Sequence, residues 1–292
     1  MMYTVNTPNT FPQMPAWAKP RHFETLEDVA FLSGAARSLL HHVLVQEDVP
    51  QPLLRARLAL RAAEACASFA GRTERAGELR DTLAFLQLGD GPGPAGALYL
   101  SWLRAMERPV SAKTLHRALP QSSAEQITVL WNMRRGPPIS CAAKILHAAL
   151  KERPRDPTYA FILADAALAK ALGWEHILPL LTLGLRSADL RKAGDALQGA
   201  CHRAITTAAT DAVGKAARLT RRAMHLRAVA PKLRAKGAEE AVALFLKEDA
   251  VAPTALTSLG SDRAARRFCD RLVGLGAARE LTGRDTFRLY GV

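Results

Sequence analysis

Aromatic residues are scarce in this chain of 292 residues, at 6%. Over most of its length the sequence also lacks an alternating apolar pattern, which excludes an extensive β-sheet. No apolar run reaches the roughly 18 residues that span a membrane. The first residues, rich in Pro, Asn and Thr, do not have the pattern of a secretory signal. We therefore expect a cytoplasmic protein with no membrane partner.

Cysteine is equally scarce, and its four residues are far apart, with no C-x-x-C pair: Cys66, Cys141, Cys201 and Cys269. Structural zinc sites need clustered ligands, and the histidines show no H-E-x-x-H spacing either. Each cysteine lies in an alanine- and leucine-rich stretch, which predicts a buried, reduced thiol. We predict no metal site and no cofactor.

No motif for catalysis is evident. The glycine-rich segment 89–96 (GDGPGPAG) lacks the lysine and the preceding strand of a phosphate-binding loop, so we interpret it as a connector. A G-x-S-x-G elbow is absent. Asp165, Glu175 and His176 could serve an enzyme built on the helices. The alternative, which we favour, places Asp165 in a buried role bridging helices, with Trp174 in the core. We predict no catalytic residue.

Alanine, leucine and arginine are abundant, and all three lose little on entering a helix. Thr25 followed by Asp28 is typical of a helix start, and apolar residues then recur at three- and four-residue steps. The predicted fold is all-α, with an irregular multi-helix body and a C-terminal winged helix. We divide the chain into a flexible N-terminal arm (1–22), a helical body (23–230) and a winged-helix module (238–292).

Residues 238–292 carry the signals of that winged helix. A helical run opens the segment, and a second helix follows Ser261, whose side chain can cap it. Two short strands come next, and Gly283 allows a tight turn between them. In the second strand we expect Phe287 and Leu289 to be buried and their neighbours exposed.

Positive charge concentrates toward the end of the chain. The net charge is +13. Two long helices are expected over residues 189–207 and 210–230. Residues 201–238 hold nine Lys or Arg against one acid, and residues 261–292 hold seven Arg against four acids. This asymmetry indicates an anionic partner, above all nucleic acid. The alternative is a solvated basic surface without a partner.

The module offers an arginine face for such a partner. On a helical wheel, three arginines lie opposite the apolar residues of the second helix, and Arg271 lies at the flank. Arg284 would project from the tip of the wing. Phosphate contacts would make binding depend on salt. The predicted nucleic-acid-binding residues are Arg263, Arg266, Arg267, Arg271, Arg284, Arg288, Arg221 and Arg222.

Three stretches of the sequence are similar to a known family: FILADAALAKALGWEHILPLL, LRAVAPKLRAKGA and SDRAARRFCDRLVGLGAARELTGRDTFRLYGV. They resemble an uncharacterised alphaproteobacterial family, domain of unknown function 1403, from Trp17 onward. The resemblance implies no activity or catalytic residue. Members of this family often occur with plasmid or mobile-element genes, which favours a function related to DNA. The final stretch also resembles the winged-helix tail of Fic-type proteins, but the H-P-F-x-x-G-N-G-R loop of Fic catalysis is missing.

These observations lead to three hypotheses. The first is a non-enzymatic DNA-binding or regulatory protein that uses the winged helix and the basic segment before it. The second is a protein-interaction module that docks a chromosome- or plasmid-maintenance complex, since winged helices also bind proteins. The third is an enzyme that uses the helical body. The sequence leaves the oligomeric state open.

Overall fold

The computed structural model describes residues 11–18, 25–86, 89–133, 136–284 and 286–292. These residues form twelve α-helices, five short 3₁₀ helices and one two-stranded antiparallel sheet, which confirms the all-α prediction with its small hairpin. No helix among them combines the length and apolar character that crossing a membrane requires. The α-helices are α1 (Leu26–Leu44), α2 (Gln51–Phe69), α3 (Ala76–Ala84), α4 (Gly93–Glu107), α5 (Ala112–Ala118), α6 (Ala124–Asn132), α7 (Pro138–Glu152), α8 (Pro157–Ala171), α9 (Leu180–Gly184), α10 (Gly194–Val229), α11 (Ala238–Phe245) and α12 (Asp262–Gly274). The 3₁₀ helices are η1 (Ala16–Ala18), η2 (Ser187–Arg191), η3 (Ala230–Lys232), η4 (Pro253–Ala255) and η5 (Thr257–Leu259), and the strands are β1 (Arg279–Glu280) and β2 (Tyr290–Gly291).

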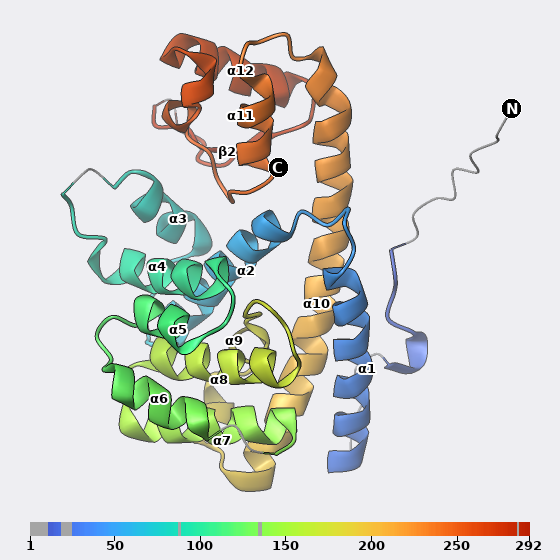
Figure 1. The fold of residues 1–292 in the computed structure, drawn as a ribbon, viewed down its shortest axis with the longest axis vertical. Helices are drawn as coiled ribbons and strands as arrows, with labels where there is room; N and C mark the ends of the chain where they lie inside the picture. Colours follow the sequence, from blue (N-terminus) through green and yellow to red (C-terminus); the bar gives the residue numbers. More distant parts are fainter. Residues whose placement is uncertain (1–10, 19–24, 87–88, 134–135, 285) are drawn as a thin grey trace, which may run out of the picture.

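The helical body packs in pairs. Helix α7 lies along α8, α2 along α4, and α1 along α10, with α1 to the right of α10 in Figure 1. Helix α8 is buried on every face from Pro157 to Ala169. Its many alanines let the neighbouring helices approach closely, so the core of the body forms around it. At the start of α1, Thr25 and Asp28 form the reciprocal cap that the sequence predicted.

Asp165 of α8 is fully buried and holds the start of α9. Its carboxylate accepts hydrogen bonds from the backbone N–H groups of Leu181 (2.8 Å) and Thr182 (3.2 Å) and from the Thr182 hydroxyl (2.7 Å). Pro179 at the N-cap position of α9 offers no side-chain acceptor, so Asp165 supplies it from another helix. Burial raises the pKa of Asp165 to about 7. This arrangement is the helix-bridging role that we favoured over catalysis.

The two long helices expected over residues 189–207 and 210–230 are a single helix, α10, of 36 residues. The threonines at the expected break do not interrupt it, because the hydroxyls of Thr206 and Thr210 each donate to a carbonyl oxygen four residues earlier. Helix α10 runs from the base of the body up to the C-terminal segment and connects the two (Figure 1).

The C-terminal segment combines α11, η4, η5, α12 and the hairpin. Strands β1 and β2 pair antiparallel, with Arg279 opposite Gly291 and Glu280 opposite Tyr290. Tyr290 also exchanges two backbone hydrogen bonds with Val251, at 2.7 and 2.9 Å, so a third extended stretch joins the hairpin. Helix α12 packs against η4, η5 and β1 (Figure 1).

The alternation expected in the second strand is wrong. Leu289 and Tyr290 are both buried, whereas Phe287 is 71% exposed. The regular pairing covers only two residues in each strand, and the stretch before it leaves the sheet. There the ring of Phe287 lies 5.7 Å from that of Phe85 beside α3. Gly283 has the positive φ (62°) for which the sequence singled it out.

Contacts also place the N-terminal arm and the C-terminal segment on the body. Of the predicted arm, residues 1–10 and 19–22 lie outside the described residues. The described part reaches α1, where the ring of Trp17 lies 5.6 Å from that of Phe31. The C-terminal segment is held through Asp249, which forms ion pairs with Arg57 of α2 and Arg80 of α3. The boundaries proposed between arm, body and module stay predictions.

Candidate nucleic-acid interface

Helix α12 separates an apolar face from an arginine face. Ser261 caps the helix by accepting a hydrogen bond from the Ala264 N–H at 3.3 Å. The inner face buries Ala265, Phe268, Cys269 and Leu272. The outer face exposes Arg263, Arg266, Arg267 and Arg271, as the helical wheel predicted. None of these four forms an ion pair with a carboxylate among the described residues.

Arg267 and Arg271 share a hollow of about 800 Å³ with the segment that follows α10. Lys232 and Arg234 lie on the opposite wall, and no acidic residue lines the space. We call it the α12 hollow. Its walls come from two separate segments, residues 231–235 and 264–271, and the charged side chains of both are positive.

A second hollow, of about 450 Å³, lies between the end of α10 and the loop that leads into β1. Arg218, Arg221, Arg222 and His225 approach from α10, at spacings of three and four residues that place them on one side of the helix. Arg279 approaches from β1. Val292 also lines this space, which we call the α10 hollow, and no Asp or Glu side chain does.

Burial and neighbouring cations lower the pKa of two basic groups near the α10 hollow. Burial lowers the pKa of Arg279, and the charges of Arg222 and Arg57 lower it further. Burial likewise lowers the pKa of Lys215, one turn before Arg218, and nearby arginines add to the effect. Asp249 and Asp211 offset part of this effect, so cations outweigh acids where α2, α10 and the hairpin meet.

The two hairpin arginines are engaged within the chain. Arg284 forms an ion pair with Asp81 of α3, with 2.9 Å between Nη2 and Oδ2. Arg288 lies 3.8 Å from the Glu280 carboxylate and donates to the carbonyl oxygen of Arg284 at 3.1 Å. The tip of the hairpin thus lies against the body.

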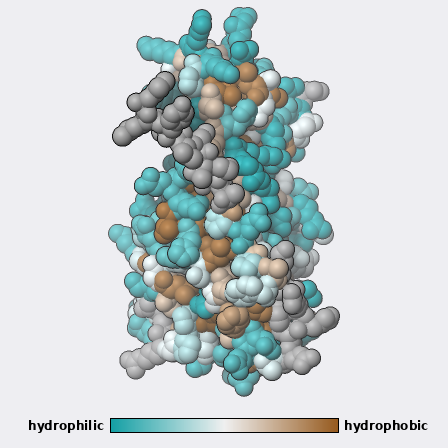
Figure 2. All heavy atoms as spheres, turned by 90° about the vertical axis from the view of Figure 1, so that its right-hand side faces the viewer, coloured by the Kyte–Doolittle hydropathy of each residue, from teal (hydrophilic) through white to brown (hydrophobic). Residues whose placement is uncertain are grey.

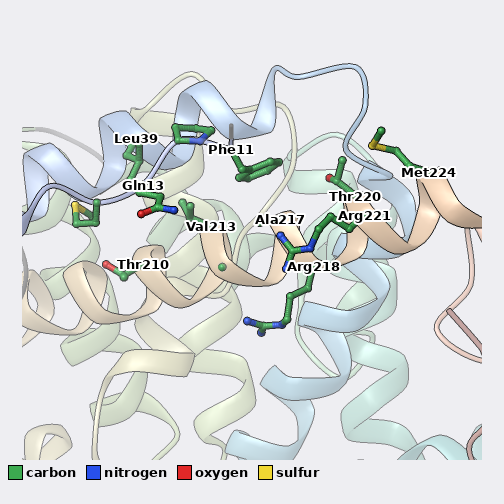
Figure 3. A pocket seen from close by; sticks show the side chains of 13 residues that line it. Phe11, Gln13, Leu39, Thr210, Val213, Ala217, Arg218, Thr220, Arg221 and Met224 are labelled. Carbon is green, nitrogen blue, oxygen red and sulfur yellow. The ribbon is translucent and has the colours of Figure 1, made fainter. Parts of the chain in front are cut away.

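A third hollow, of about 550 Å³, is bounded by the N-terminal arm, α1 and α10. Figure 3 shows Phe11 of the arm and Leu39 of α1 over α10, with Arg218 and Arg221 side by side on α10. These two arginines also line the α10 hollow, so the two spaces adjoin. In Figure 2, which shows this side of the molecule, many hydrophilic side chains surround a small apolar patch in the upper part, and further apolar patches lie lower down.

The candidate enzymatic residues do not form one site. Glu175 and His176 line a hollow of about 530 Å³ together with Arg55 and His41, but Asp165 is not among its lining residues. The His176 Nδ1 and a Glu175 carboxylate oxygen are 3.9 Å apart. Asp165 accepts hydrogen bonds at the start of α9. It therefore does not share a site with Glu175 and His176, although the three residues are close in sequence.

In the described part of the chain, no three His, Cys, Asp or Glu side chains are grouped so that they could hold a metal ion. The four cysteines are buried, as the sequence predicted. Burial raises the pKa of the Cys66, Cys201 and Cys269 thiols to about 12. These thiols are poor nucleophiles, because the thiolate is the reactive form.

The eight predicted arginines therefore fall into four pairs. Arg267 and Arg271 line the α12 hollow, Arg221 and Arg222 line the α10 hollow, Arg263 and Arg266 are exposed on α12 outside both hollows, and Arg284 and Arg288 are engaged with acids.

Four cations of the two hollows were not among the predicted site residues, although all but Arg279 belong to the basic segment 201–238: Arg218, Arg279, Lys232 and Arg234. Arg218 could have been found, because it continues the spacing of Arg221, Arg222 and His225. The place of Arg279 depends on how the hairpin meets α10 and leaves no sequence signal.

Comparison with known proteins identifies one family. Its model, described as protein of unknown function (DUF1403), matches residues 3–292. No curated protein matches this chain.

Proposed function

For a chain that belongs to the DUF1403 family, we propose a non-enzymatic role in which residues 238–292 form a winged helix that binds DNA. The observation that carries the proposal is the exposed arginine face of α12, which has no acidic partner among the described residues. The two cation-lined hollows beside it extend the same positive surface. A protein that binds DNA without catalysing a reaction on it would act as a DNA-binding or regulatory protein.

The order of elements supports the winged-helix assignment. Helix α11 comes first, then the extended contact at Val251, the 3₁₀ pair η4 and η5, α12, and the β1–β2 hairpin. In helix-turn-helix proteins the second helix of the motif lies in the major groove. In the proposed motif α12 would be that second helix, and η4 and η5 would provide the short first helix and the turn.

Contacts with phosphates would supply most of the affinity. Arginine suits this task, because its planar guanidinium can bind two phosphate oxygens at once. Arg263 and Arg266 would contact the DNA from the outer side of α12. Arg267 and Arg271 would do so from the side that faces Lys232. We assign Arg284 and Arg288 a secondary role, because each already has an acidic partner.

The test is a titration of the full chain with random duplex DNA over a range of salt concentrations. We expect affinity to fall with salt, with a log–log slope of about 0.9 for each phosphate neutralised. The Arg263/Arg266/Arg267→Ala variant should bind more weakly, with a slope smaller by up to roughly 3. A matched control, Arg108/Arg155/Arg191→Ala, removes three exposed arginines from the body and should change little. Binding that is absent, or indifferent to both salt and the α12 substitutions, would refute the proposal.

A second candidate function is docking of a protein partner by the same module. It is favoured by two exposed apolar side chains near the arginines, Val273 of α12 (40%) and Met224 of α10 (48%). Such residues add contact area to a protein interface and give little to a phosphate backbone. A stoichiometric protein partner in a pull-down, together with no shift of DNA, would favour this candidate.

A further inference from the structure

We infer that the α10 hollow is a phosphate-binding site formed by Arg218, Arg221, Arg222 and Arg279. The site differs from the α12 face, because its residues come from α10 and β1 and two of them were not predicted from sequence. The inference rests on the proposed function only for the source of the phosphate, which is either the DNA backbone or a free phosphate compound.

The lining of the hollow favours an anion of this kind. Four arginines from two elements line a space of about 450 Å³, which lies in the range of small-ligand sites. The floor is made of Gly276, Ala277 and Ala278, which are too small to fill the space. The N–H groups of Ala277 and Ala278 both donate to the Leu272 carbonyl, so recognition falls to the side chains.

No Asp or Glu side chain lines the hollow, and the last residue, Val292, lines it with its main-chain oxygen engaged by Arg57 at 3.4 Å. The buried carboxylate in this region, Asp249, is already shared by Arg57 and Arg80. Burial, and after it the charges of neighbouring arginines, lower the pKa of Arg279 and of Lys215. An anion in the hollow would relieve this repulsion, and a phosphate carries enough charge and enough acceptor oxygens to engage several arginines at once.

His225 completes the rim and is held in place. Its Nε2 lies 3.1 Å from the carbonyl oxygen of Leu275. Because a carbonyl oxygen only accepts, Nε2 carries the proton and donates it. This bond ties α10 to the end of α12, so the two sides of the hollow keep their separation and the site exists before a ligand arrives.

The experiment measures binding of inorganic pyrophosphate to the full chain by isothermal titration calorimetry at low salt. We expect the wild type to bind and the Arg222→Gln/Arg279→Gln variant to bind at least about tenfold more weakly, because the variant loses two of the four guanidinium groups that would form charge-assisted hydrogen bonds with the phosphate. The control Arg203→Gln/Arg227→Gln removes two exposed charges from α10 outside the hollow. It should stay within about twofold of the wild type, because exposed charges outside the site contribute little.

A wild type that does not bind pyrophosphate, or two double variants that are weakened equally, would overturn the inference in favour of a solvated basic surface. A thermal melt of the wild type adds a readout that needs no variant. Pyrophosphate should raise the melting temperature, and sodium chloride of equal ionic strength should not. The opposite result, with no stabilisation by pyrophosphate, also overturns the inference.

Competition then identifies the source of the phosphate. If duplex DNA displaces pyrophosphate, the hollow holds a backbone phosphate, and if it does not, the hollow holds a free phosphate compound. Both results support the site. Failure of DNA binding by α12 leaves the pyrophosphate result standing, and failure of pyrophosphate binding leaves the α12 proposal standing, so the two ideas fail separately.

Discussion

Asp249 forms an ion pair with Arg80, 169 residues earlier in the chain, with 2.7 Å between its Oδ2 and the Arg80 Nε. Its other carboxylate oxygen contacts Arg57, which also donates to the main-chain oxygen of Val292 at 3.4 Å. One buried carboxylate thus joins α2 and α3 to the segment that precedes η4. The position of the C-terminal segment, and with it the α10 hollow, depends on this group.

Replacement of Asp249 by Asn should destabilise the protein by about 3–5 kcal/mol, because two arginines would keep their charge in a largely buried place with no carboxylate between them. Urea unfolding followed by circular dichroism measures the change. The control Asp270→Asn alters an exposed acid of α12 and should stay within about 0.5 kcal/mol of the wild type. Equal unfolding midpoints for the two variants would show that the ion pair does not anchor the segment.

Release of the hairpin from α3 should strengthen DNA binding. Asp81→Asn removes the partner of Arg284 and leaves its guanidinium for a phosphate. We expect a few-fold gain in affinity and a salt slope steeper by about 0.9. The loss of stability should stay below about 1 kcal/mol, because Arg284 is half-exposed and the pair is screened.

The control for Asp81 is Asp195→Asn at the other end of α10, which makes the same change in net charge far from α12. The structure also predicts that Arg284→Ala alone changes DNA affinity little. A loss as large as that caused by Arg267→Ala would mean that the hairpin already contacts the DNA.

The free energy of unfolding should depend on pH because of the buried carboxyl group of Asp165. Its folded pKa, about 7, lies above its ordinary value of 3.8. The folded state therefore holds this proton over a range in which the unfolded state has released it. The contribution is complete below about pH 4 and is lost as pH rises through about 7, for a total of up to about 4 kcal/mol.

The measurement compares unfolding free energies of the wild type and Asp165→Asn between pH 4 and pH 8, since the amide keeps an acceptor for α9 and has no proton to lose. The difference between the two proteins should drift in favour of the variant as pH rises. His202 acts in the opposite direction, because burial lowers its pKa to about 4. Taking the difference removes its effect, and a constant difference would contradict the assignment.

Gly184 sets the distance between α9 and α10. A Cβ atom added there would lie 2.2 Å from the carbonyl oxygen of Ala204, which is backbone and cannot move aside. Gly184→Ala should therefore cost about 1–3 kcal/mol. Gly77→Ala in α3 meets no atom within 4 Å and should be neutral or stabilising by up to about 1 kcal/mol. Thermal melts of the pair test this, and equal behaviour would rule out tight packing at Gly184.

Local physics accounts for what could be predicted from the amino-acid order. Side-chain caps at Thr25 and Ser261, helix-forming composition and the spacing of apolar residues depend on neighbours within a few positions, so they are legible without a structure. The same holds for the arginine face of α12, which follows from its period. Where a local signal was weak, as at the threonines within α10, the prediction placed a break that the helix does not have.

Long-range contacts decided the rest. The pairing of Asp249 with Arg80, the contact of Arg284 with Asp81 and the approach of Arg279 to α10 join residues far apart in the chain. No residue propensity or sequence period predicts these contacts, because each depends on how whole helices pack. The order of residues therefore established that this chain is helical and basic at one end. Packing established which arginines surround a hollow and which are already held by an acid.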